Sequence, residues 1–79
     1  MDYENVLRIV IESIKVETGF DGEISESSSS YDVEGWDSLA HARIIFRTDL
    51  QLGTTIEMSK THGAGNVGEL AQIFLLAIS

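Results

Sequence analysis

The sequence contains no cysteine and no proline. Without cysteine, the chain can form neither a disulfide framework nor a thiolate metal site. Its 79 residues leave room for a single domain, 1–79, with one small hydrophobic core, so helix packing has to stabilise it. The absence of proline and the lack of alternating strand patterns are in keeping with a small helical bundle. We therefore expect a small all-α protein.

Basic residues are also few. Five Lys and Arg stand against 13 Asp and Glu, which gives a formal net charge of -8. Such a chain repels phosphate backbones and anionic bilayers, so neither nucleic acid nor a membrane is expected as a partner. The charge favours encounters with basic patches on other proteins, although acidity can also serve only to keep a protein in solution.

Long apolar runs are missing as well. No segment approaches the ~20 apolar residues of a membrane span, and residues 1–4 lack the basic start of a signal peptide. We therefore expect a cytoplasmic protein. Hydrophobic residues nevertheless make up 43% of the chain, which is typical of a folded domain and not of a disordered tail.

The first apolar periodicity predicts a helix from about Asp2 to about Thr18. Asp2 can cap its start, and Gly19 suits the left-handed residue that commonly follows a helix. Residues 21–35 have no apolar face and contain four consecutive serines among acidic residues, so we expect a long loop there. The side chains expected to pin this loop to the core are Ile24, Tyr31, Val33 and Trp36.

A second helix is expected from Asp37-Ser38 to about Leu52, with Gly53 ending it. Asp37 is a good N-cap, and its charge complements the positive end of the helix dipole. The expected buried stripe of this helix consists of Leu39, Ala42, Ile45, Phe46 and Leu50.

The last helical pattern starts at Asn66, which can form a reciprocal cap with Glu69. Its apolar face consists of Val67, Leu70, Ala71, Phe74 and Ile78. Residues 54–65 are interpreted as a connector with room for one short helical turn, because Gly63 and Gly65 are poor helix formers. One common core is expected to include Leu39, Phe46, Ile56, Leu70 and Phe74.

Ser38 is the one place where the pattern itself makes chemistry plausible, because it starts a helix behind an aspartate and a long acidic loop. A serine in this position is more often a helix cap. His41 follows by three residues and suggests a nucleophile and base, but so short a chain has no evident oxyanion hole or cleft for hydrolysis. We expect His41 at the surface, His62 in a loop, and no metal site, because no ligand spacing is recognisable.

Several motifs occur together in this chain. Residues 35–39 read Gly-Trp-Asp-Ser-Leu, residues 52–56 read Leu-Gly-Thr-Thr-Ile, and residues 66–70 read Asn-Val-Gly-Glu-Leu. Over almost the whole chain they resemble the acyl carrier protein family, with its Asp-Ser-Leu motif at Asp37-Ser38-Leu39 and a Thr-Val-Gly-Glu-Leu start to its last helix.

The resemblance implies a small four-helix bundle with a long first loop and a short or irregular third helix. It also implies that Ser38 receives 4′-phosphopantetheine from coenzyme A, with Asp37 and Leu39 flanking the attachment site. The arm brings the reactive thiol that a chain without cysteine lacks, and the chain itself is then no enzyme. The implied partners of this monomer are a phosphopantetheinyl transferase and the loading and condensing enzymes of fatty-acid or polyketide biosynthesis.

The second helix departs from the well-known fatty-acid carriers, which present acidic side chains to their enzymes. Ala40, Arg43 and Arg47 interrupt the acidic face here. We expect these three residues, together with Ile56, to contact the partners of a specialised or secondary pathway.

Two alternatives remain open at this point. The arginines could pair with Asp37 or Asp49 and only balance local acidity. The chain could also be a helical interaction module that has the carrier fold and is never modified. The acyl or aminoacyl cargo is not readable from the sequence, because the enzyme that loads the arm chooses it.

Overall fold

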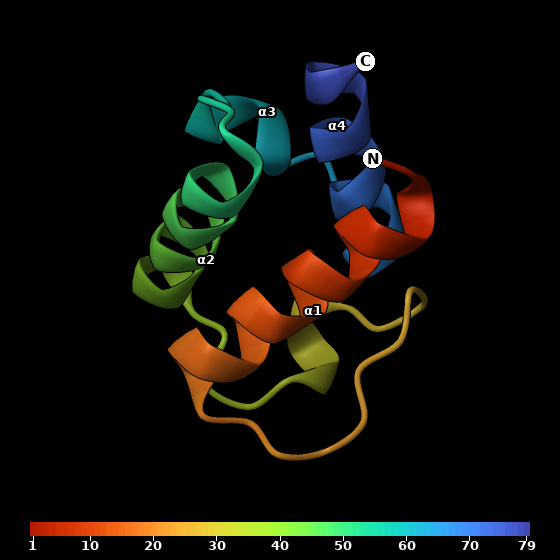
Figure 1. Ribbon diagram of the computed structural model, residues 1–79. Helices are drawn as coiled ribbons and strands as arrows, with labels where there is room; N and C mark the ends of the chain where they lie inside the picture. Colours follow the sequence, from red (N-terminus) through yellow and green to blue (C-terminus); the bar gives the residue numbers. More distant parts are fainter.

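The computed structural model describes residues 1–79 and contains four α-helices and no strands (Figure 1). The helices are α1 (Tyr3–Thr18), α2 (Ser38–Leu52), α3 (Met58–Thr61) and α4 (Val67–Ile78), and a short 3-10 helix, η1, spans Ser30–Asp32. The all-α prediction is confirmed, including a third helix of only one turn. None of these helices combines the length and the apolar character needed to cross a bilayer.

Side chains cap the starts of three of the four α-helices, α1, α2 and α4. Asp2 accepts a hydrogen bond from the backbone N–H of Asn5, and Asn66 accepts one from Glu69. The reciprocal half of the expected Asn66 cap is not formed, because the Glu69 carboxylate instead accepts from the backbone of Gly65 at 3.4 Å. The glycines that follow α1 and α2 have φ angles of 72° and 70°, so left-handed backbone ends both helices as predicted.

α1 lies across the molecule and packs against both α2 and α4 (Figure 1). The core lies where these three helices meet, and Leu70 and Phe74 of α4 are fully buried in it, as expected. Ile56 is half-buried against the same core. The ten core residues are Val6, Val10, Ile14, Val33, Ile44, Ile45, Val67, Leu70, Ala71 and Phe74.

The predicted buried stripe of α2 is largely wrong. Leu39, Phe46 and Leu50 are 62%, 65% and 70% exposed. α2 carries a second stripe at helical spacing, and that one faces the core. Its polar member, Thr48, donates its hydroxyl to the Ile44 carbonyl at 2.8 Å. A threonine whose hydroxyl forms a hydrogen bond within its own helix can be buried at little cost in free energy. The buried residues of α2 are Ala40, Ile44, Ile45 and Thr48.

The long loop between α1 and α2 is pinned by three of the four expected side chains. Val33 is buried, and Ile24 and Trp36 are half-buried against the core. Tyr31 is 98% exposed, so its predicted role as a pin is wrong. Its place in η1, a single turn without buried residues, directs it away from the core.

The backbone of the same loop closely approaches α4 and the end of α1. The N–H of Gly68, at the start of α4, donates to the carbonyl of Glu26 at 2.8 Å. A Cβ on Gly68 would lie 3.1 Å from that oxygen, so a glycine permits the close approach. Gly35 has a φ of 91°, and a Cβ there would lie 2.9 Å from the carbonyl oxygen of Thr18. Glycine at this position lets the chain pass the end of α1 on its way into α2.

Candidate functional site

Ser38 is the first residue of α2, and its side chain is exposed. Its neighbour Asp37 is the N-cap and accepts a hydrogen bond from the backbone N–H of Ala40 at 2.8 Å. The Ser38 hydroxyl makes no hydrogen bond within the chain, because the capping role belongs to Asp37. Asp37 is therefore the N-cap, as predicted, and the alternative that Ser38 caps the helix is wrong, which leaves the serine hydroxyl free.

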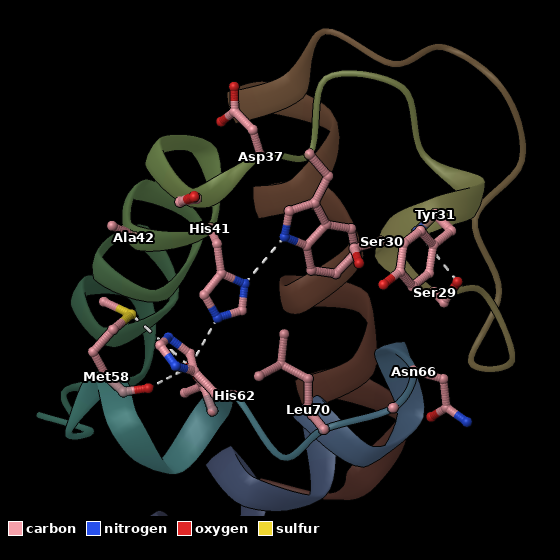
Figure 2. A pocket seen from close by; sticks show the side chains of 15 residues that line it. Ser29, Ser30, Tyr31, Asp37, His41, Ala42, Met58, His62, Asn66 and Leu70 are labelled. Atoms are coloured by element: carbon pink, nitrogen blue, oxygen red, sulfur yellow. Dashed lines mark hydrogen bonds between the residues drawn. The ribbon is translucent and has the colours of Figure 1, made fainter.

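Ser38 borders a groove of about 500 Å³ between the long loop, α2, α3 and the start of α4. In Figure 2, His41 lies near the centre of the groove, with Met58 and His62 on one side and Ser30 and Tyr31 on the other. The lining residues are Ser29, Ser30, Tyr31, Trp36, Asp37, Ser38, His41, Ala42, Met58, Thr61, His62, Ala64, Gly65, Asn66 and Leu70.

His41 connects three segments that line this groove. Its Nδ1 accepts a hydrogen bond from the indole N–H of Trp36 at 3.1 Å, and its Nε2 lies 2.8 Å from Thr61 Oγ1. The Thr61 hydroxyl in turn donates to the carbonyl of Met58 at 2.7 Å. An indole can only donate, so Nδ1 is unprotonated and Nε2 carries the proton that bonds Thr61. His41 is therefore neutral in this arrangement, and it links the loop, α2 and α3.

The expectation that His41 is a simple surface residue is therefore wrong. Burial lowers its pKa, and the nearby His62 ring, whose centroid is 5.6 Å away, lowers that pKa further. The Trp36 ring stacks on His41 with an interplanar angle of 17°. His62 directly follows the single turn of α3 and is exposed, as predicted for a loop residue.

The geometry does not pair Ser38 with His41 as nucleophile and base. Both ring nitrogens of His41 are engaged with other side chains, and no hydrogen bond joins the imidazole to the serine. No group of three or more His, Asp or Glu side chains that could hold a metal ion is present.

The four residues expected to contact partners lie in different environments. Ala40 is buried towards the core, so its predicted role at a partner surface is wrong. Ile56 is half-buried against the core, where its N–H donates to the carboxylate of Asp49. Arg43 is exposed and forms no ion pair within the chain.

Arg47 has a partner that the sequence did not suggest. Its Nε donates to Glu17 Oε2 of α1 at 2.7 Å, instead of pairing with Asp37 or Asp49 on its own helix. Asp49 is occupied at the end of α2, where it accepts hydrogen bonds from Thr54 and Ile56. The pair with Glu17 ties α2 to α1.

Beside the exposed arginine, the outward side of α2 carries three apolar side chains. We call this surface the α2 outer face, and it consists of Leu39, Arg43, Phe46 and Leu50. A second, shallower hollow of about 400 Å³ lies between this face and Glu17. The sequence pattern hid this surface, because its residues have the same helical spacing as a core stripe.

Sequence reasoning missed the Trp36–His41–Thr61 arrangement and the contribution of Ser30 and Tyr31 to the groove. Trp36 and His41 are close in sequence, but Thr61 lies twenty residues further on, and only the tertiary fold brings it to the imidazole.

Comparisons with protein-family models, with curated proteins and with solved structures return no match for this chain.

Proposed function

We propose that the protein is an acyl carrier protein whose Ser38 bears a 4′-phosphopantetheine arm. The observation that carries this proposal is the free, exposed hydroxyl of Ser38 at the first residue of α2, on the border of a groove. The resemblance of Asp37-Ser38-Leu39 and the flanking motifs to the carrier family assigns the same serine. The chain then acts as a carrier and performs no chemistry of its own.

The local structure fits a phosphate-linked group at Ser38. The first amides of a helix and its dipole favour a phosphate, and the side chain of Asp37 accepts only from the N–H of Ala40 among them. Ser38 is itself exposed, so a modifying enzyme can reach it, and Leu39 beside the attachment point is exposed as well. When bound, the arm supplies a thiol that holds acyl groups as thioesters.

The α2 outer face supports a protein partner for this carrier. Three of its four side chains are large and apolar, although they stand in solvent next to the proposed attachment site. Arg43 adds a cation without an ion pair to a protein with a net charge of -8. We propose that a loading or condensing enzyme of a specialised pathway binds this face with an apolar hollow and a carboxylate.

The proposal is tested by the intact mass of the protein after incubation with coenzyme A and a broad-specificity phosphopantetheinyl transferase. A gain of one phosphopantetheine mass is the expected result. No gain, under conditions that fully load an unrelated carrier protein in the same tube, would favour the unmodified interaction module instead.

A further inference from the structure

We propose that the groove beside Ser38 binds a short hydroxylated acyl group, in preference to a purely aliphatic or a carboxylated one of the same size. This inference rests on the proposed function, because the acyl group is taken to arrive on an arm attached to Ser38.

The available space limits the length of the cargo. Ile44, Leu70 and Phe74 are at most 1% exposed, so the interior between the helices is filled by the protein's own side chains. The groove of about 500 Å³ is the larger of the two hollows near α2, and it has Ser38 on its border. Its volume lies within the roughly 300–1,000 Å³ typical of small-ligand sites. A short acyl group can therefore bind in the groove without opening the core.

Polar groups around the groove favour a cargo that forms hydrogen bonds. The hydroxyls of Ser30 and Tyr31 make no hydrogen bond within the chain, nor does the imidazole of His62. Trp36 and Leu70 contribute apolar walls between these groups. An aliphatic cargo would displace water from these polar atoms without offering them new hydrogen bonds, and leaving polar atoms covered and unpaired costs free energy. A hydroxyl on the cargo can both donate to and accept from them.

Charge argues against a carboxylated cargo. No Lys or Arg lines the groove, and His41 is held neutral by its two hydrogen bonds. Asp37 is the only acidic side chain in the lining, in a protein of net charge -8. A second carboxylate near it would be repelled and would find no cation.

The experiment compares three acyl groups loaded onto the ¹⁵N-labelled protein from their coenzyme A thioesters by a broad-specificity phosphopantetheinyl transferase. The transfer joins the phosphopantetheine phosphate to the Ser38 hydroxyl, breaks the pyrophosphate bond of coenzyme A and releases adenosine 3′,5′-bisphosphate. The first two, 3-hydroxybutyryl and 3-methylbutyryl, have the same shape and differ only in a hydroxyl against a methyl, and the third is succinyl. Intact mass confirms the loading, and amide and indole resonances report the contact. Trp36 is the only tryptophan, so its indole N–H gives one unambiguous signal in the groove.

The 3-hydroxybutyryl protein is expected to shift the resonances of Trp36, Ser30 and Tyr31 more than the other two loaded proteins. In the double variant Ser30→Ala/Tyr31→Phe, this shift should fall to the level of the 3-methylbutyryl protein. Ser59→Ala, which removes an exposed hydroxyl outside the groove, should leave the shift unchanged.

Two other results would overturn the inference in distinguishable ways. If loading succeeds but the methyl or carboxyl cargo perturbs the groove as much as the hydroxyl cargo, the carrier proposal stands and the preference for hydroxylated cargo is wrong. If no thioester loads onto the unaltered protein, both proposals fail.

Discussion

His41 holds three segments of the molecule together through its two ring nitrogens. It accepts from Trp36, which precedes the site, and donates to Thr61 of α3, so only the neutral imidazole can make both bonds. A protonated Nδ1 would face the indole N–H of Trp36, so two hydrogen-bond donors would point at each other and the bond would be lost. Burial already lowers the pKa of His41, and the His62 ring lowers it further, while Asp37, the N-cap of α2, lies four residues earlier in the sequence.

Stability should therefore depend on pH through His41. Its folded-state pKa lies below the unfolded value of about 6.5, so the unfolded chain binds the proton first as pH falls. This contribution is fully present above about pH 6.5 and is lost as pH falls towards the lowered pKa. We expect the melting temperature to decrease as the pH is lowered from about 7.5 to about 5.

The matched control is His41→Gln, whose amide can accept from Trp36 and donate to Thr61 but does not titrate in this range. Its melting temperature should fall less over the same pH interval. Identical pH profiles for the two proteins, measured by circular dichroism, would show that protonation of His41 does not cause the loss of stability in this pH range.

α2 has two apolar sides, and only one of them faces the core. Truncating a phenylalanine in the core and one on the outward side of α2 should therefore have very different effects on stability. Phe74→Ala in α4, within the core that α2 covers, should cost ~3–5 kcal/mol because it leaves a cavity. Phe46→Ala on the α2 outer face should change stability by less than ~1 kcal/mol, because Phe46 is 65% exposed. Urea unfolding of both variants checks this, and a large loss for Phe46→Ala would place it in the core after all.

The two arginines of α2 should also behave differently. Arg43 is exposed and unpaired, whereas Arg47 bonds Glu17 and contributes at most ~1 kcal/mol to holding α2 against α1. We expect Arg43→Glu to leave stability unchanged but to slow loading by the cognate enzyme, with a difference that shrinks as salt rises.

The control for Arg43→Glu is Lys15→Glu, an equal change of charge on α1, outside the α2 outer face. It should have a smaller effect on the loading rate. Equal loading rates for the unaltered protein and Arg43→Glu at low salt would leave the arginine an ordinary surface residue.

At the scale of the whole molecule, the helices were predictable because their signals are local. Asp2, Asp37 and Asn66 are caps that act within one turn, and Gly19 and Gly53 end helices through their own backbone. These features do not depend on what the rest of the chain does.

The orientation of α2 was not predictable, because burial depends on which neighbouring helix it meets. Leu39 and Phe46 have the spacing of a core stripe, but α1 covers the side that carries Ile44 and Thr48. The groove was hidden for a similar reason, since its walls come from segments far apart in sequence. Ser38 could be singled out from the sequence because a motif marks it, but its free hydroxyl follows from the cap geometry of Asp37.

If Ser38 is the one serine that carries the arm, its removal should abolish loading. We would measure the intact mass of Ser38→Ala after reaction with coenzyme A and the transferase, beside the matched variant Ser30→Ala. Both serines are exposed and border the same groove, so neither substitution should unfold the protein. We expect one added phosphopantetheine on Ser30→Ala and none on Ser38→Ala, whereas an added arm on Ser38→Ala would rule out Ser38 as the attachment site.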